Sequence, residues 1–222
     1  LNFNRIEDNK DSLLILSRIE LVSFSRSLFS VYEEDKRFTF HFEANKAKIY
    51  ADMDAIKLGV ILDNLLSNAV KFTPDGGSVR LSLFYREETG LLDICVSDTG
   101  SGIPQQDIPY IFQRFFQSPH SGNKEGTGIG LYLVKTYTEL HGGHINGVTS
   151  NEGKGTSIGL NIPVIAVEKE EIPATQVKKQ LESLPVLKPI EAESQDEKFL
   201  SNIIRLIEDL SLIHISEPTR RR

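Results

Sequence analysis

The chain is poor in cysteine and in positive charge. Cys95 is the one cysteine in 222 residues, so no intrachain disulfide can form and a reducing cytosol is compatible with the sequence. Because Cys95 lies in the apolar run LLDICVSD, we expect it to be a buried small hydrophobe. A net charge of −6 and a pI near 5.5 leave no general polycationic surface, so we expect no direct nucleic-acid binding.

Long hydrophobic runs are also lacking. The apolar runs are far shorter than the roughly 18 residues of a membrane helix, and no signal peptide opens the chain. We therefore predict a cytoplasmic chain without membrane contact, and leave open whether a longer parent is anchored in the inner membrane. What is present, 39% hydrophobic and 25% charged residues, is ordinary for a globular protein with a sizeable core.

Composition divides the chain into five predicted regions. Residues 13–164 mix strand and helix patterns and are expected to form one domain, whereas residues 1–12 are polar. Residues 165–197 are rich in Glu, Lys and Pro, which indicates a linker. Residues 198–209 show helical spacing, as at the start of a truncated further module. Residues 210–222 contain LSLIHISEPTR, which looks like a translated sequencing adapter and predicts a non-native tail.

The hydrophobic periodicity predicts an α+β domain. Strand and helix signals intermix without the regular alternation of a parallel sheet, so we expect a two-layer sandwich in which helices cover one face of a mixed sheet. The predicted strands are a short one inside 13–22, then 37–44 with 47–52 as its hairpin partner, 78–85, 91–98, 144–150 and 156–164. Four helices are predicted. The first ends at about Tyr32, and the second runs from an N-cap at Asp52 or Asp54 to about Lys71. The third bears Ile108, Ile111, Phe112, Phe115 and Phe116 on one face, and the fourth runs from Ile129 to His141.

Three glycines stand directly before the last predicted helix, in KEGTGIGLYLVKTY, residues 124–137. Such a loop lets backbone N–H groups approach a polyphosphate, which the positive helix N-terminus then stabilises. The segment does not follow a strand, and neither the Lys nor the Ser/Thr of a P-loop follows the glycines, so a dinucleotide fold and a P-loop are excluded. A plain turn stays as the alternative.

Two further clusters carry candidate chemistry. Asn64 and Asn68 lie four residues apart on one helix face with Lys71 beyond them. The amides either satisfy each other, or Asn68 offers its carbonyl oxygen to Mg²⁺ while Lys71 neutralises phosphate. Asp98 ends an apolar strand and precedes Gly100 and Gly102. These glycines allow a turn with positive φ, and Asp98 can accept a hydrogen bond from an adenine amino group.

The order of these clusters resembles the ATP-binding catalytic domain of sensor histidine kinases. The segments DNLLSNAVKFTPDGG, DTGSGIP, IFQRFFQ, GTGIGLYLVK and GGHINGVTSNEGKGTSIGLNIPV are similar to its N, G1, F, G2 and terminal-strand motifs, in that order. The resemblance covers residues 13–164 and implies the Bergerat sandwich shared with gyrase, mismatch-repair and heat-shock chaperone ATPases. It also implies a kinase of two-component signalling that transfers the ATP γ-phosphoryl group to histidine, with ATP and Mg²⁺ as cofactors.

The resemblance assigns roles residue by residue. Asn68 is the Mg²⁺ ligand, Lys71 contacts phosphate, Asn64 lines the same helix face, Asp98 binds the adenine amino group and Thr156 lies beside adenine. Phe72 stands near the nucleotide or in the core, and Arg114 reaches phosphate or solvent. Phe112, Phe115 and Phe116 are expected to anchor a lid formed by the polar loop 117–128. The other residues that it assigns to nucleotide binding are Gly100, Gly102, Ile103, Gly126, Thr127, Gly128, Ile129, Gly130 and Leu131.

One position separates kinases from hydrolases. ATP-hydrolysing relatives have a glutamate general base four residues before the Mg²⁺ asparagine, and here that position is Asn64, which cannot take a proton. A histidine kinase therefore fits better than a switch ATPase. A module that binds ATP or a partner kinase without phosphotransfer stays open as a second hypothesis.

The phosphoacceptor histidine is missing. His41, His120, His141 and His144 lie in a strand, in the lid loop and beside a Gly-Gly stop, where we expect structural or solvated side chains. In the family the acceptor lies upstream on a dimerisation helix, and residues 1–12 resemble the end of such a helix. Since the chain does not begin with Met, we expect it to be a piece of a longer homodimeric parent. The expected partners are that parent's histidine-bearing dimerisation domain and a response-regulator receiver domain.

Overall fold

The computed structural model describes residues 14–119 and 126–164, which all belong to one compact unit, Leu1–Ala166. The regions predicted at 1–12, 165–197, 198–209 and 210–222 lie outside the described residues, as do His120 and residues 120–125 of the predicted lid loop. Within the described ranges no helix is both long and apolar enough to cross a membrane.

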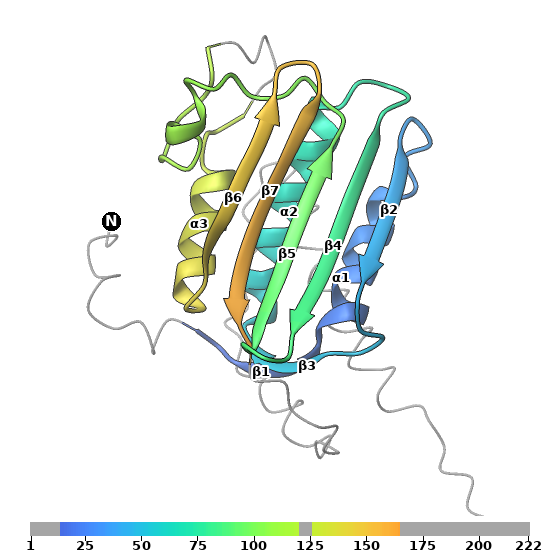
Figure 1. Ribbon diagram of the computed structural model, residues 1–222, viewed down its shortest axis with the longest axis vertical. Coiled ribbons are helices and arrows are strands. Elements are labelled where there is room, and N and C mark those ends of the chain that lie inside the picture. The colour runs from blue at the N-terminus through green and yellow to red at the C-terminus, as the bar shows by residue number, and fades with distance from the viewer. Residues whose placement is uncertain (1–13, 120–125, 165–222) are drawn as a thin grey trace, which may run out of the picture. The chain divides into compact units, whose positions relative to one another are not determined.

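A five-stranded mixed sheet forms one layer of the fold (Figure 1). Its strand order is β2-β4-β5-β7-β6, and the strands are β2 (Thr39–Ala44), β4 (Ser78–Arg86), β5 (Leu91–Asp98), β6 (His144–Asn151) and β7 (Gly155–Pro163). β2 pairs with β4 in parallel, and the other neighbours are antiparallel. A separate two-stranded ladder joins β1 (Ser17–Glu20) to β3 (Tyr50–Met53).

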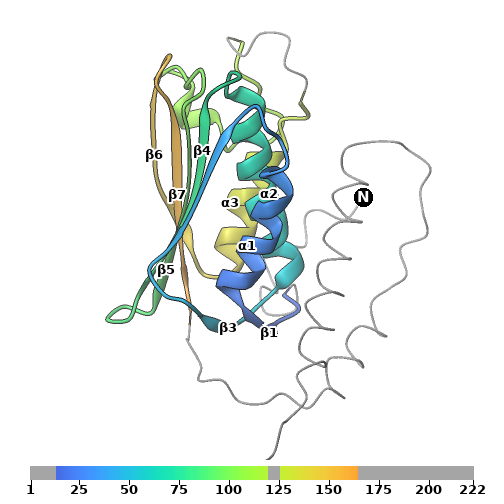
Figure 2. The same cartoon turned by 90° about the vertical axis from the view of Figure 1, so that its right-hand side faces the viewer.

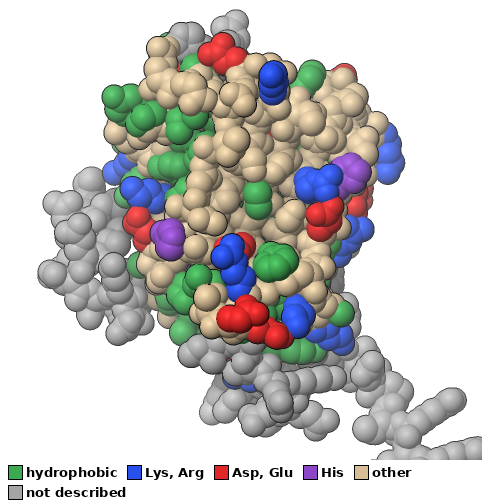
Figure 3. Space-filling view, viewed as in Figure 1, with side chains coloured by type: hydrophobic (Ala, Val, Ile, Leu, Met, Phe, Trp, Pro, Cys, Tyr) green, Lys and Arg blue, Asp and Glu red, His purple; other side chains and the backbone are tan. Residues whose placement is uncertain are grey.

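Three helices cover one face of the sheet (Figure 2). They are α1 (Leu21–Tyr32), α2 (Ala55–Phe72) and α3 (Gly130–Leu140). The predicted two-layer α+β sandwich is therefore confirmed. The opposite face carries no helix in the part of the chain that the structure describes, and over its middle the hydrophobic side chains are isolated among polar ones (Figure 3).

The core lies between the sheet and the helices because apolar residues alternate along each strand and recur every three or four residues on each helix. Large side chains that are fully buried there include Phe24, Phe29, Leu58, Ile61, Leu62, Leu66, Leu81, Leu83, Leu92 and Ile94. Burying each such side chain contributes roughly 1.5–3 kcal/mol. This core fixes α2 against the strands whose ends carry the candidate site.

The structure corrects the predicted pairing of residues 47–52. These residues do not form a hairpin with β2: the strand is β3, and it pairs with β1, with Ser17 opposite Met53. β2 instead lies beside β4, with Thr39 opposite Ser78. Alternating sequence identifies a strand but not its partner, because pairing depends on contacts far apart in the chain.

Only one of the two predicted caps begins α2. Asp54 is the N-cap, and its Oδ1 accepts the Lys57 N–H at 3.0 Å. Asp52 points away and pairs with Arg18 across the β1–β3 ladder, with Nε to Oδ1 at 2.8 Å. Asp52 lies within β3, whereas Asp54 follows the strand at the start of α2, so the two carboxylates serve different elements.

The aromatic segment after β5 is not the predicted helix. Only Ile108–Tyr110 form a short 3₁₀ helix, η3, and turns follow it. Phe115 has a φ of 65° and a side chain that is 59% exposed.

Cys95 also differs from expectation: it is half-buried on the helix-free face of β5, with Sγ 3.2 Å from Oγ of Ser157.

Candidate functional site

The C-terminal half of α2 supplies the amides and the lysine. Asn64 donates its Nδ2 to the carbonyl of Val60 at 2.8 Å, and among the described residues no hydrogen bond joins it to Asn68. Asn68 is half-buried and makes no side-chain hydrogen bond with the described residues, which leaves its amide available. Nζ of Lys71 lies 5.2 Å from the centre of the Phe72 ring. The alternative in which the two amides satisfy each other is therefore wrong.

The glycine segment before α3 packs against this part of α2. A Cβ on Gly126 would lie 3.1 Å from Nζ of Lys71, and one on Gly130 would lie 2.4 Å from Oδ1 of Asn64. A side chain at Gly130 would displace the Asn64 amide, whereas at Gly126 the flexible end of Lys71 could move aside. Helix α3 begins at Gly130. Its first backbone N–H groups, which have no partner within the helix, thus lie beside the amide-bearing face of α2.

Three further residues of the G2 motif, Thr127, Ile129 and Leu131, lie directly before α3 or in its first turn. Thr127 Oγ1 accepts the backbone N–H of Ile129, the N-cap residue, at 3.3 Å. Thr127 is exposed, whereas Ile129 and Leu131 are half-buried.

Asp98 stands at the end of β5 and is held by backbone donors. Its Oδ1 accepts the N–H of Gly100 at 2.7 Å and the N–H of Thr156 at 3.2 Å. Its Oδ2 accepts no hydrogen bond from the described part of the chain. Burial raises the pKa of the Asp98 carboxyl, and the two backbone bonds act in the opposite direction. One carboxylate oxygen is thus fixed in place while the other is left to accept from a ligand.

The loop after Asp98 is fixed from two sides. The carbonyl of Phe72 at the end of α2 accepts the Ser101 N–H at 3.1 Å, and the carbonyl of Ser101 accepts the Gly153 N–H at 2.7 Å. Gly102 has a φ of 74°, and a Cβ there would lie 2.1 Å from the carbonyl oxygen of Asn151. The loop therefore joins α2 to the β6–β7 turn, and Gly102 is required for both its conformation and its close contact.

Sequence reasoning missed two residues that support this end of the site. Gly155 has a φ of 90° and touches the backbone of Asp98, where a Cβ would lie 1.9 Å from the carbonyl oxygen. Ser150 accepts the Ile103 N–H at 2.7 Å and lies 2.9 Å from Oγ1 of Thr156. The GKGT sequence could have identified Gly155, since a Gly before a half-buried Thr suggests close backbone approach, but no local pattern identifies Ser150.

The F segment touches the glycine segment through its backbone. The Phe115 N–H donates to the carbonyl of Gly128 at 2.8 Å, and Gln117 Nε2 donates to the carbonyl of Gly126 at 2.7 Å. The expectation that Phe115 anchors by packing is wrong, because its ring is exposed and the guanidinium of Arg114 lies over it at 4.5 Å.

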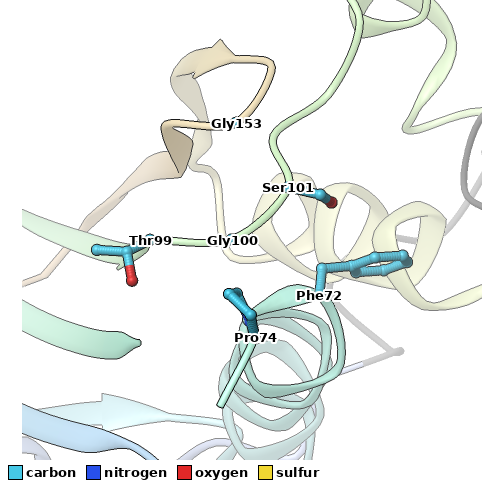
Figure 4. A pocket seen from close by; sticks show the side chains of 6 residues that line it. All are labelled: Phe72, Pro74, Thr99, Gly100, Ser101 and Gly153. Carbon is cyan, nitrogen blue, oxygen red and sulfur yellow. The ribbon is translucent and has the colours of Figure 1, made fainter. Parts of the chain in front are cut away.

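A cavity of about 300 Å³ opens beside these residues, between the end of α2, the loop after β5 and the β6–β7 turn (Figure 4). Its lining comprises Phe72, Pro74, Thr99, Gly100, Ser101 and Gly153. It does not include Asp98, Asn68 or Lys71, so the cavity and the polar candidate groups do not coincide. The Phe72 ring points away from Pro74 and Thr99 (Figure 4). The polar groups offer specific chemistry to a ligand, whereas the cavity lining is mostly backbone, small polar side chains and two rings.

The described histidines fit structural roles. His141 caps the end of α3, where Nδ1 donates to the carbonyl of Tyr137 at 2.7 Å and Nε2 accepts the Asp54 N–H at 3.3 Å. Burial lowers the pKa of His141, which favours this neutral form. His144 contacts Asn161 on the helix-free face, and His41 lies in β2.

The donor set suits a hard cation held by few protein ligands. Among the described residues no group of three or more His, Cys, Asp or Glu side chains could hold a metal. Asn68 has an available amide oxygen close to Lys71 on α2, and Mg²⁺ is often bound through one or two protein oxygens together with water and phosphates. The residues present therefore fit a Mg²⁺ ion that enters with a nucleotide.

Comparisons with known proteins identify a family for the chain. Residues 53–166 match the family model of histidine kinase-, DNA gyrase B-, and HSP90-like ATPases. The chain is 36% identical over 160 residues to the sensor histidine kinase WalK of Bacillus subtilis, a match that covers 70% of the chain but 26% of that relative.

Two solved structures share the fold. One is a mycobacterial sensor histidine kinase, MprB, with a TM-score of 0.58 and 28% identity, covering 69% of this chain and 100% of that one. The other is ShkA in complex with AMPPNP, with a TM-score of 0.61 and 25% identity, covering 70% of this chain and 32% of that one.

Proposed function

The chain belongs to the family of histidine kinase-, DNA gyrase B-, and HSP90-like ATPases, and we propose that it binds ATP with Mg²⁺ and transfers the γ-phosphoryl group to a histidine of another domain. The observation that carries this proposal is the convergence of three groups: the amide and lysine of α2, the glycine segment before α3 and the Asp98 carboxylate. The lysine ammonium and the backbone N–H groups suit the phosphates of a nucleotide, and the Asp98 carboxylate is an acceptor that suits its base.

The phosphates are bound at the junction of α2 and α3. Lys71 lies beside Gly126 and supplies positive charge, and the start of α3 at Gly130 supplies backbone N–H groups. Asn68 offers its amide oxygen to Mg²⁺. When bound, Mg²⁺ neutralises part of the negative charge on the phosphates. Because phosphoryl transfer requires mainly positioning and charge stabilisation, these groups meet its needs without a covalent intermediate on this chain.

The base is recognised at the ends of β5 and β7. Asp98 Oδ2 accepts a hydrogen bond from the 6-amino group of adenine, because Oδ1 already accepts two backbone N–H groups. Thr156 lies next to Asp98 and adds a hydroxyl. Gly100 and Gly102 allow the loop to turn close to α2 and to β6. Phe72, Ile103, Thr127, Ile129 and Leu131 complete the proposed nucleotide contacts, and Arg114 is proposed to reach phosphate.

Asn64 argues for transfer to histidine over transfer to water. Its Nδ2 donates to Val60 and its Oδ1 lies against Gly130, so this amide packs between two helices. An amide cannot accept a proton from water at neutral pH, and hydrolysis lacks its general base at this position. In the proposed reaction an imidazole nitrogen attacks the γ-phosphorus, the bond to the β,γ-bridging oxygen breaks, and ADP leaves.

The proposed partners are a histidine-bearing dimerisation domain of a homodimeric parent and the receiver domain of a response regulator. The chain spans about a quarter of the length of WalK, 26%, so other parts of such a kinase would supply the acceptor. A docking or sensing module that binds ATP without transfer is the second candidate. The half-buried Asn68 amide makes no hydrogen bond with the described residues, and this favours the kinase because it leaves a metal ligand on the same helix as Lys71.

Phosphotransfer tests the proposal. The chain is incubated with ATP labelled at the γ-phosphate, Mg²⁺ and a separately supplied pair of dimerisation helices bearing histidine. We expect acid-labile label on the helices. Asp98→Asn and Asn68→Asp should each reduce labelling at least tenfold, because one removes the acceptor charge and the other alters the metal ligand. Chelation of Mg²⁺ with EDTA should abolish labelling.

Matched substitutions on the surface serve as controls. Asp75→Asn removes an exposed carboxylate, and Asn146→Asp adds one on β6, so both should keep full labelling. Binding of ATP without label on the helices would support the docking module instead. Absence of any ATP binding by calorimetry at millimolar Mg²⁺ would refute both.

A further inference from the structure

Ser150 is a buried hydroxyl at the centre of the β6–β7 end of the fold. It is 4% exposed. Its Oγ lies 2.7 Å from the backbone nitrogen of Ile103, 3.1 Å from the carbonyl oxygen of Gly155 and 2.9 Å from Oγ1 of Thr156. Ile103 lies in the loop after β5, and Gly155 and Thr156 begin β7, so Ser150 links that loop to the start of β7.

Counting protons determines the direction of each bond. A serine hydroxyl has one proton to donate and two lone pairs to accept with. The Ile103 N–H occupies one lone pair, and the Gly155 carbonyl can only accept, so it takes the Ser150 proton. The second lone pair of Ser150 then accepts the proton of Thr156. Reversing the last bond would leave two oxygen atoms, Ser150 Oγ and the Gly155 carbonyl, 3.1 Å apart without a proton between them.

This direction fixes what Thr156 can offer a ligand. With its proton directed at Ser150, Oγ1 of Thr156 presents lone pairs only. The Asp98 carboxylate beside it is likewise an acceptor, and its Oδ1 receives the Thr156 N–H at 3.2 Å. The base-recognising end of the site thus presents acceptors without a side-chain donor from either residue.

We propose that Ser150 is a positioning residue that orients the Thr156 hydroxyl as an acceptor and so makes the site select 6-amino purines over 6-oxo purines. This rests on the proposed nucleotide-binding function. A 6-amino group donates hydrogen bonds, as in ATP, whereas the 6-oxo group of ITP accepts them. Two acceptors facing the 6-oxo group repel it, and only a free Thr156 proton can bond to it.

The test is the ratio of ATP to ITP affinity, measured by calorimetry with Mg²⁺ on the whole chain. The wild type should prefer ATP. Ser150→Ala removes the acceptor for the Thr156 proton, so the hydroxyl rotates and donates to the 6-oxo group. The ATP/ITP preference should fall about tenfold, which is about 1.4 kcal/mol. The ratio isolates base recognition, because general damage to the fold weakens both nucleotides alike.

A double-mutant cycle shows whether Ser150 acts through Thr156. Thr156→Val removes the hydroxyl at nearly constant shape, and in that background Ser150→Ala should leave the ATP/ITP ratio unchanged. Ser25→Ala, at another buried serine on α1, controls for loss of a core hydroxyl and should keep the wild-type ratio. Should Ser150→Ala fail to fold, Ser150→Cys replaces it: a thiol is a weak acceptor, so the fall should be smaller but in the same direction.

The outcomes separate this inference from the proposed function. The role of Ser150 would be overturned, while ATP binding stands, by any of three results. These are an unchanged ATP/ITP affinity ratio in folded Ser150→Ala, an equal fall of that ratio in the Thr156→Val background, and a wild type that does not prefer ATP to ITP. Failure of the wild type to bind either nucleotide would overturn the proposed function itself.

Discussion

Replacing Gly155 by alanine should destabilise the domain by more than its backbone conformation alone predicts. The Cβ would lie 1.9 Å from the carbonyl oxygen of Asp98, 2.8 Å from the carbonyl carbon of the same residue and 2.9 Å from Cα of Thr99. All three are backbone atoms, so no side chain can rotate away and β5 must separate from β7. Such overpacking costs about 1–3 kcal/mol.

The positive φ adds a second, separable cost. Gly155 has a φ of 90°, and an L-residue in the left-handed region loses roughly 1–2 kcal/mol. The sum for Gly155→Ala is about 2–5 kcal/mol, a large part of the roughly 5–15 kcal/mol that stabilises an ordinary domain.

Substitutions at two other glycines separate the conformational cost from the steric cost. Gly153 has a φ of 72° with nothing within 4 Å of its Cβ position, so Gly153→Ala should lose only the conformational cost, about 1–2 kcal/mol. Gly147 has no such φ and equally open space, so Gly147→Ala should change stability by less than about 1 kcal/mol.

Urea unfolding followed by far-ultraviolet circular dichroism measures all three variants, since the chain has no tryptophan for fluorescence. The expected order of unfolding free energies is Gly147→Ala, then Gly153→Ala, then Gly155→Ala as the least stable. Equal midpoints for Gly153→Ala and Gly155→Ala would show that β7 gives way without cost, and the steric argument would be refuted.

Two further predictions concern half-buried polar groups. Tyr32→Phe removes the bond from the phenol to Oδ1 of Asp63 at 2.5 Å and should lower the unfolding free energy by about 1 kcal/mol in urea titrations; no loss would mean that this bond contributes nothing. Acidification should also destabilise the domain through His141, because burial lowers its folded pKa. Its contribution to stability is complete above the unfolded pKa near 6.5 and is lost as pH drops below that value, because His141 of the unfolded chain takes up a proton there. The folded side chain, whose Nε2 accepts the Asp54 N–H, stays neutral until its own lower pKa. His141→Gln should flatten this dependence between pH 7 and 5, and an unchanged slope would assign it to other groups.

Much of the fold was predictable because its patterns are local. The alternation in residues 78–85 and 91–98 gives β4 and β5, and the spacing of apolar residues after Asp54 gives α2. The pairing of β3 with β1 was not predictable, since the alternating residues 47–52 fit several partners equally well.

The F segment shows where helical spacing misleads. Ile108, Ile111, Phe112, Phe115 and Phe116 recur as on a helix, yet the chain turns after Tyr110 and Phe115 adopts a positive φ. Its backbone instead bonds to Gly128, a contact that depends on a segment distant in sequence. Spacing counts only local preference, and tertiary contacts decided this stretch.

The site was predictable where its chemistry is concentrated in short motifs. The structure places Asn64 against Gly130 and Lys71 against Gly126, which brings the polar helix face and the glycine segment together. It also holds Asp98 by backbone donors. The roles assigned to these residues stay predictions. Ser150 was not predictable, because a serine in a strand is common and its importance arises only from the three partners that folding places around one oxygen.

The carboxylate of Asp54 receives the backbone N–H of Ile15 at 3.0 Å as well as Nζ of Lys57 at 2.8 Å. The polypeptide entering the domain is thereby fastened to the first turn of α2, whereas Lys71 stands in its last turn, roughly 25 Å away along the axis. A displacement of Ile15 must either break this partly buried hydrogen bond or shift α2 along its axis. The hydrogen bond to Ile15 and the proposed phosphate-binding residue Lys71 thus lie at opposite ends of one helix.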